Sequence, residues 1–343
     1  MSLLKKKFNR KRKYKNYINI DGERRKVFRK NSFCSKKIIK IIIYFTILSL
    51  SILAISKIIF RKKKKILYEK DDINSKIDQL KNLTKNNQTL IEHVEKCIMN
   101  NPDEEKCIYH FLCPKEVVGK NRVLFGTKKD GCYVLLDDLE NIKIAYSIGI
   151  DGIIQFDQAL ADKGIDDYMY DHTIEKLPYE NEKFHWKKIG IGGNSQRSNN
   201  IQTLQEMLKE NGHLNEKNMI FKMDVEGAEW ETLKDTPEDV LLQFKYLAFE
   251  YHFGEEYYPF FYDVLKKIYK THQPFYVHCN PPAALKIYGN NIICRELEVS
   301  YIIREGNNFI TDKSEYPIPE LSYGDNKYFN PNILKLFDKY SQV

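Results

Sequence analysis

Three acidic residues and one histidine stand where they could act as general bases. Asp224 and Glu226 directly follow one apolar run of the chain, and Glu250 and His252 close another. If both runs are parallel strands of one sheet, their carboxyl ends meet at one edge and bring these side chains together. Groups of this kind can take a proton from a substrate hydroxyl or hold a divalent cation. We predict these four residues as catalytic and assign no residue as a metal ligand, although a divalent metal stays open.

A second group of residues indicates a nucleoside pocket. The apolar run 142–148 passes through Gly149 and Gly152 into a helical pattern at 153–163, and Asp171 follows Gly149 by 22 residues. Glycine lets the backbone approach a ligand closely, and the helix start offers unpaired N–H groups. An acid at about this interval accepts hydrogen bonds from ribose hydroxyls in doubly wound folds. The predicted cofactor-binding residues are Ser147, Gly149, Asp151, Gly152 and Asp171.

The elements that must position these residues alternate between strands and helices from about residue 107. Apolar runs predict strands at 142–148, 167–170, 219–223, 246–250 and 275–278, and helical spacing predicts helices at 153–163, 201–211 and 259–270. This alternation predicts an α/β fold with a doubly wound, mostly parallel sheet covered on both faces. The glycine turn lacks the full G-x-G-x-x-G pattern, which favours an adenosyl cofactor over a dinucleotide.

Several of these motifs together resemble a known family. They are YSIGI at 146–150, FD at 156–157, YDHT at 170–173, GIGG at 190–193, KMDVEGAEW at 222–230 and FEYHF at 249–253. They look like the methyltransferase-like protein 24 family, which is related to the FkbM-type methyltransferases, and the likeness covers about residues 107–305. The resemblance implies a Rossmann-like fold that uses S-adenosylmethionine. It also implies that Gly149 borders the methionine moiety, Asp171 holds the ribose and Asp224 lies by the reactive methyl group.

Charge is divided unevenly along the chain. Residues 1–65 hold 22 Lys and Arg against two acids, a balance of +20, whereas the whole chain is at +8 and the remaining 278 residues are therefore at −12. A nucleic-acid enzyme carries its basic surface on the folded domain, where the substrate lies. We therefore expect no nucleic-acid partner.

Residues 38–60 form an apolar segment whose only charges, Lys40 and Lys57, lie near its ends. At ~1.5 Å per residue the segment reaches about 34 Å, enough to cross a bilayer as a helix. The basic stretch before it is too long for the leading region of a cleaved signal peptide. Fifteen basic residues in 1–37 against five in 61–65 predict a cytosolic N-terminus. The expected protein is a single-pass type II membrane protein of the Golgi or endoplasmic reticulum with a lumenal C-terminal domain.

Cysteines and glycosylation sequons agree with a lumenal domain. Asn82 and Asn87 each begin an N-x-T acceptor. Six of the seven cysteines lie beyond the span, and an even number permits three disulfides whose connectivity is not readable. These six are Cys97, Cys107, Cys113, Cys132, Cys279 and Cys294. Buried free thiols are the alternative.

The predicted organisation is a basic tail at 1–37, the span at 38–60, a stem at 61–106 and a methyltransferase-like domain at 107–343. Positions in the stem alternate spacings of four and three between residues 73 and 98 and so fall on one helical stripe. Weak self-association through the stem is one interpretation of this stripe, and a surface helix is the other.

These features together predict a membrane-anchored S-adenosylmethionine-dependent methyltransferase that modifies an oxygen of a sugar, glycan or small metabolite. Two alternatives stay open. A type II Golgi glycosyltransferase has the same membrane architecture, and Asp224-Val225-Glu226 resembles a metal-binding D-x-D. A non-catalytic binding protein would keep the fold, and Ser147 favours it, because many methyltransferases have an acid there that pairs with the cofactor's ammonium group.

Overall fold

The computed structural model describes residues 92, 107–288, 291–326 and 329–335. The predicted tail, the span at 38–60 and, apart from Glu92, the stem with its helical stripe lie outside these residues, as do Asn82, Asn87 and Cys97. Within the part that the structure describes, no helix has the length and apolar character that a membrane span requires.

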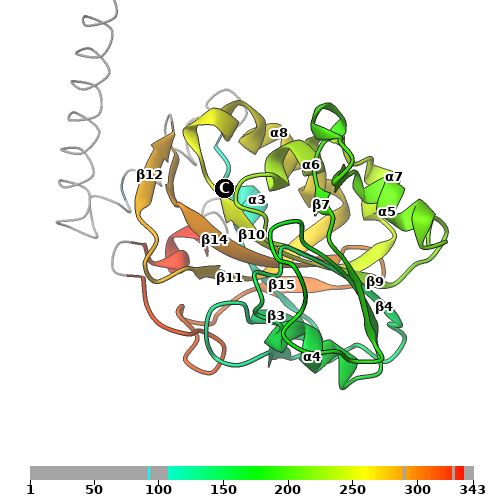
Figure 1. Cartoon of the computed structure of the whole chain (residues 1–343). Helices are drawn as coiled ribbons and strands as arrows, with labels where there is room; N and C mark the ends of the chain where they lie inside the picture. The colour runs from blue at the N-terminus through cyan, green and yellow to red at the C-terminus, as the bar shows by residue number, and fades with distance from the viewer. Residues whose placement is uncertain (1–91, 93–106, 289–290, 327–328, 336–343) are drawn as a thin grey trace, which may run out of the picture. The chain divides into compact units, whose positions relative to one another are not determined.

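A seven-stranded sheet forms the centre of the domain (Figure 1). Its strands, in spatial order, are β11 (His272–Cys279), β14 (Glu296–Ile303), β10 (Phe244–His252), β9 (Met219–Met223), β4 (Ile144–Ile148), β5 (Asp166–Tyr170) and β6 (Phe184–Lys187). β14 runs antiparallel to both of its neighbours, and the other six strands are parallel to one another. If the seven strands are numbered in chain order and followed across the sheet from β6 to β11, their order is 3-2-1-4-5-7-6. This is the dinucleotide-binding order 3-2-1-4-5-6 with one antiparallel strand, β14, inserted. The predicted mostly parallel α/β sheet is confirmed, and it fits a Rossmann-like fold.

Helices cover both faces of this sheet (Figure 1). One face carries α5 (Leu204–Glu210), α6 (Glu229–Asp235), α7 (Glu238–Leu241) and α8 (Tyr258–Thr271), with the short α3 (Tyr109–Leu112) packed against α8. The other face carries α4 (Gln155–Ala161) and the hairpin of β2 (Arg122–Phe125) and β3 (Tyr133–Leu136). Three two-stranded pairs complete the domain: β1 (Lys115–Val117) with β15 (Phe309–Thr311), β7 (Gly190–Ile191) with β8 (Ile201–Gln202), and β12 (Leu285–Tyr288) with β13 (Asn291–Cys294).

The strands read as continuous apolar runs because both of their faces are buried. All five residues of β9 are buried, and in β10 only Lys245 is partly exposed. Trp230 of α6 is fully buried, with its ring centroid 5.1 Å from that of Tyr251 and 4.4 Å from that of Phe261. This aromatic cluster fixes α6 against the carboxyl end of β10, where two of the predicted catalytic residues lie.

The described cysteines include one disulfide and a buried free thiol. Cys279 and Cys294 form a disulfide that ties the end of β11 to the end of β13. Cys132 is a buried free thiol, and burial raises its pKa to about 12. Three disulfides would need all six cysteines beyond the span, so that alternative is wrong, and Cys132 follows the other alternative of a buried free thiol.

Candidate functional site

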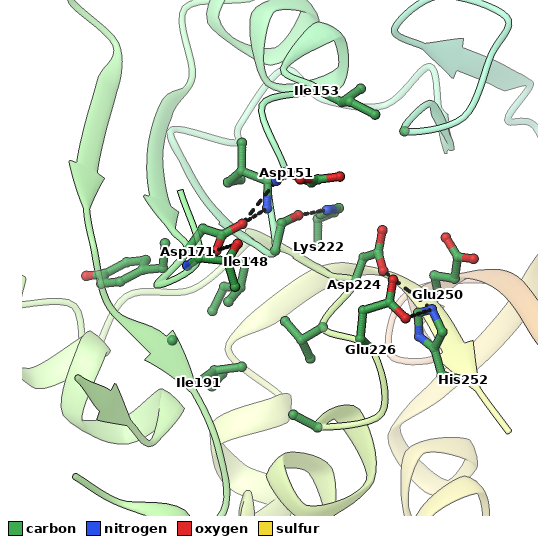
Figure 2. A pocket seen from close by; sticks show the side chains of 18 of the residues that line it. Ile148, Asp151, Ile153, Asp171, Ile191, Lys222, Asp224, Glu226, Glu250 and His252 are labelled. Carbon is green, nitrogen blue, oxygen red and sulfur yellow. Dashed lines mark hydrogen bonds and ion pairs between the residues drawn. The ribbon is translucent and has the colours of Figure 1, made fainter. Parts of the chain in front are cut away.

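A crevice opens where the strand order reverses, between β4 and β9. Connections from these neighbouring strands lead to opposite halves of the sheet, which leaves space beyond their carboxyl ends. A cavity of about 560 Å³ lies there (Figure 2), within the size range of small-molecule sites. Its walls come from the turn after β4, the end of β5, the loop after β9, the end of β10, and residues near 130, 190, 280 and 296.

The turn after β4 brings two backbone segments into direct contact. Gly149 has a φ of 79°, and a Cβ placed there would lie 1.6 Å from the carbonyl oxygen of Asp224. The N–H of Gly149 donates to the Tyr170 carbonyl at 2.9 Å, and the N–H of Asp224 donates to the Ile148 carbonyl at 3.0 Å. The Lys222 ammonium donates to the Gly149 carbonyl. Only glycine fits at 149, because the two loops that border the crevice touch at this point.

Asp171 holds the same turn from the end of β5. Its Oδ2 accepts the N–H groups of Ile150 at 2.8 Å and Asp151 at 3.0 Å, and its Oδ1 accepts the N–H and the hydroxyl of Thr173 at 2.7 and 2.6 Å. Burial alone would raise the pKa of Asp171, but these hydrogen bonds hold it below its ordinary value. A carboxylate has about four lone-pair sites, and these four hydrogen bonds occupy all of them. Asp171 therefore lies at the turn, as predicted, and acts there as its clamp, so a further donor would have to replace the Thr173 hydroxyl.

The other predicted cofactor-binding residues divide between the cavity and the protein interior. Asp151, with a φ of 43°, lines the cavity together with Gly149 and Asp171. Gly152 is not among the lining residues. Ser147 is not either, because its buried hydroxyl donates to Asp167 Oδ2 at 3.0 Å beneath the turn.

All four predicted catalytic residues line the cavity (Figure 2). Asp224 lies next to the glycine turn, and Glu226, Glu250 and His252 lie farther from it. The Nε2 of His252 lies 3.3 Å from Glu226 Oε2 and 4.0 Å from Asp224 Oδ1. Glu250 is buried two residues before His252 on the same strand. The structure thus brings together side chains that the sequence separates by up to 28 positions.

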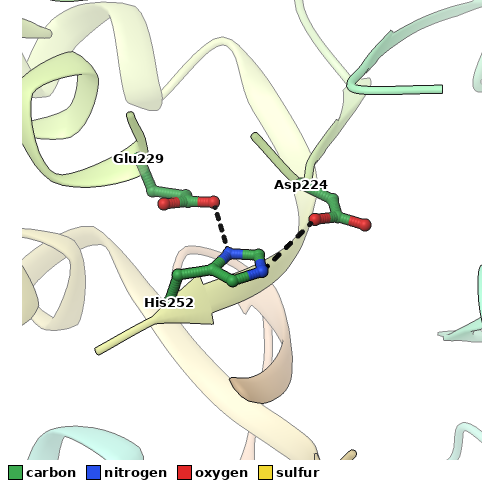
Figure 3. A group of neighbouring side chains, drawn as sticks. All are labelled: Asp224, Glu229 and His252. Atoms are coloured by element: carbon green, nitrogen blue, oxygen red, sulfur yellow. Dashed lines mark hydrogen bonds and ion pairs between the residues drawn. The ribbon is translucent and has the colours of Figure 1, made fainter. Parts of the chain in front are cut away.

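His252 has a further partner, Glu229, in the first turn of α6. Its Nδ1 donates to Glu229 Oε1 at 3.0 Å, so the ring lies between Glu229 and Asp224 (Figure 3). Burial alone would lower the pKa of His252, but Glu229, Glu250 and Asp224 raise it to about 9. The ring is therefore an imidazolium at neutral pH.

β14 adds two acids to the site that the sequence did not predict. Glu298 lies directly opposite Glu250 in the antiparallel ladder, and Glu296 lies opposite His252. Burial raises the pKa of Glu298 to about 8, although the Tyr323 hydroxyl donates to it at 2.6 Å. Burial, followed by Asp224 and Glu298, raises the pKa of Glu250 well above its ordinary value. Burial thus favours the protonated forms of Glu250 and Glu298, which lessens the repulsion between them.

Two places near the cavity gather ligand atoms within 4.8 Å of one another. One consists of Asp224, Glu229 and His252, and the other adds Asp130 to Glu250 and Glu298. The His252 imidazolium balances the carboxylates of the first group, and burial favours the protonated forms of Glu250 and Glu298 in the second. As in the sequence analysis, we assign none of these residues as metal ligands.

Lys222 is a further functional residue that the sequence did not single out. Besides holding the Gly149 carbonyl, its ammonium lies 5.4 Å from the centre of the Tyr133 ring, whose hydroxyl donates to Asp224 Oδ2 at 3.3 Å. Among the residues that the structure describes, the cavity lining contains seven Asp and Glu residues and no Lys or Arg besides Lys222. A ligand with positive charge suits this lining better than an anion does.

No protein-family model and no curated protein matches this chain, so a function assigned to it rests on the geometry of the site.

Proposed function

We propose that this domain is an S-adenosylmethionine-dependent methyltransferase that methylates an oxygen of a sugar, glycan or small metabolite. The observation that carries the proposal is the acid-lined crevice at the switch point, where a clamped glycine turn lies against Asp224. Bound there, S-adenosylmethionine would supply a methyl group on a positively charged sulfur. Even when Glu250 is protonated and Lys222 and His252 are positively charged, the other acids of the lining outnumber the cations and suit that charge.

The two ends of the crevice suit different parts of such a reaction. Around the turn, the side chains of Ile148, Ile153 and Ile191 line the cavity and offer an apolar surface to a base. On the other side stand His252 and Glu226, which suit an acceptor hydroxyl. Asp224 lies between the two ends, where the methyl group would pass.

In this proposal His252 is the general base. Its Nε2 faces the cavity, and its Nδ1 is held by a carboxylate, which is the arrangement of an oriented imidazole base. Glu226 is the residue that an acceptor would displace from Nε2, because its side chain is 85% exposed. The acceptor oxygen would take the methyl group as its proton passes to Nε2. Because only the neutral ring accepts a proton, the rate should rise with pH toward the His252 pKa of about 9.

The proposal extends to the whole chain as the sequence predicts it. Residues 38–60 would anchor the protein in the Golgi or endoplasmic reticulum membrane, and the stem at 61–106 would carry the domain into the lumen. The Cys279–Cys294 disulfide supports an oxidising compartment. We also propose weak self-association through the stem, membership of the methyltransferase-like protein 24 family and the absence of a nucleic-acid partner.

Calorimetry on the full-length chain in detergent tests the proposal. We expect S-adenosylmethionine and S-adenosylhomocysteine to bind, and UDP-sugars with Mn²⁺ to give no signal. The opposite result would favour a glycosyltransferase, and binding of neither class would contradict both enzymes.

Two glycine variants locate the binding. Gly149→Ala should abolish it, because the new Cβ would meet the Asp224 carbonyl. Gly164→Ala is the matched control, since Gly164 also has a positive φ of 78° but has open space around it. If the two variants bind equally well, the site lies elsewhere.

A further inference from the structure

Glu229 differs from the other acids around His252 because its side chain is wholly buried. Its Oε1 accepts the backbone N–H of Val225 at 2.9 Å as well as the Nδ1–H of His252 at 3.0 Å. Its Oε2 has no hydrogen-bond partner among the described residues. The next residue, Trp230, donates its indole N–H to the carbonyl of His252 at 2.8 Å. The first turn of α6 thus holds both the ring and the backbone of His252.

A charged group in this place is costly for the fold. Burying a carboxylate is unfavourable by several kcal/mol unless a partner compensates it, and removing one partner leaves the other uncompensated. An uncharged amide could accept the same two N–H groups at lower cost. The carboxylate has an advantage only if the imidazole carries a positive charge for part of the time.

We propose that Glu229 is the positioning residue of the site, holding the His252 ring by Nδ1 so that Nε2 faces the acceptor, and stabilising the imidazolium that forms when Nε2 takes a proton. This inference rests on the proposed function, because it assigns the proton of the acceptor hydroxyl to His252. Glu229 itself touches neither cofactor nor acceptor and acts through the ring.

Other acids face His252 from every element around it. Glu250 lies on its own strand, Glu296 opposite it on β14, and Asp224 and Glu226 on the loop after β9. Glu226 makes the best comparison with Glu229. Both carboxylates contact the same ring, but Glu226 is exposed and meets Nε2, whereas Glu229 is buried and meets Nδ1.

The test compares Glu229→Gln with Glu226→Gln in the full-length chain. Histidine signals are followed by NMR during a pH titration, and His252→Gln identifies the signal of His252. In wild type this signal should titrate near pH 9. Glu229→Gln should move the midpoint to lower pH, because a neutral amide does not stabilise the imidazolium, and Glu226→Gln should move it less because water screens an exposed charge. Methyl transfer measured with S-adenosylmethionine should follow, with its rising pH limb displaced to lower pH in Glu229→Gln and its maximal rate reduced by roughly 10²-fold.

Each outcome decides one question. If Glu229→Gln changes only the melting temperature and leaves both the titration and the pH limb in place, Glu229 is a structural residue and the inference is overturned. If the titration moves but the wild-type chain transfers no methyl group, the coupling of the two residues stands and the proposed function fails. Should Glu229→Gln not fold, His252→Gln decides instead, since a pH limb that persists near 9 without the ring contradicts the inference.

Discussion

Asp151 and Glu226 line opposite sides of the cavity and have a backbone conformation that residues with a Cβ rarely adopt. Their φ angles are 43° and 55°. Of the described residues other than glycine, only Asn218 also has a positive φ, and it lies just before β9, away from the cavity. A conformation of this kind costs about 1–3 kcal/mol and persists where function needs the side chain. We interpret both carboxylates as ligand contacts that the fold retains at this cost.

A glycine substitution at 151 should therefore separate stability from binding. We expect Asp151→Gly to raise the free energy of unfolding by up to about 1 kcal/mol, because glycine adopts this φ without strain. We expect the same change to weaken S-adenosylmethionine binding, because one carboxylate leaves the cavity. Asn218→Gly is the control and should leave binding unchanged, which urea denaturation and calorimetry measure for both variants. Equal binding by Asp151→Gly and wild type would show that this carboxylate does not contact the cofactor.

At the scale of elements, the turn between β4 and α4 depends on side chains from the next strand and its loop. Asp171→Asn keeps one acceptor oxygen but turns an amide N–H₂ toward backbone N–H groups that need an acceptor. We expect a loss of about 2–3 kcal/mol in the free energy of unfolding and weaker S-adenosylmethionine binding. Thr173→Val removes one hydroxyl donor, so it should cost about 1 kcal/mol and leave Asp171 open to a ribose hydroxyl. If Thr173→Val loses as much binding as Asp171→Asn, the threonine hydroxyl contacts the cofactor directly.

Local sequence patterns predict the elements whose position depends on neighbouring residues, and they miss an element whose position depends on long-range pairing. Strand 219–223 is found at its predicted bounds, and the glycine turn follows β4 as expected, because apolar runs and glycines are local signals. β14 was missed, since it follows β11 in the chain yet lies between β10 and β11 in the sheet, a place decided by long-range pairing. Glu296 and Glu298 were missed with it.

Single residues show the same limit. Ser147 precedes Ile148 on β4, and because side chains alternate along a strand, Ile148 lines the cavity while Ser147 bonds Asp167 inside the protein. Glu229 carries the local pattern of a helix-capping acid, and it does accept the Val225 N–H. The contact between the Glu229 carboxylate and His252 depends on the packing of Trp230 against β10, which a local pattern does not contain.

At the scale of the whole molecule, the disulfide and the glycosylation sequons depend on the same compartment. The Cys279–Cys294 bond closes a separation of 15 residues and secures the segment that brings Asn280 and Pro282 to the cavity. A loop of this length corresponds to about 3 kcal/mol of stability in the chain-entropy treatment. Disulfides persist in the secretory pathway and are rare in the cytosol.

The proposed lumenal location therefore predicts two coupled results for the full-length protein isolated from eukaryotic cells. Without reductant, Cys279 and Cys294 should resist alkylation even when the chain is denatured, and glycosidase treatment should increase the electrophoretic mobility of the protein. The double variant Asn82→Gln, Asn87→Gln should already migrate at the faster position, and glycosidase should not change it. Cys279→Ser combined with Cys294→Ser should lower the free energy of unfolding by about 3 kcal/mol in denaturant titrations. Alkylation of both cysteines together with no glycosidase effect would place the domain on the cytosolic side, because an oxidising lumen with glycosylation enzymes would leave at least one of the two marks.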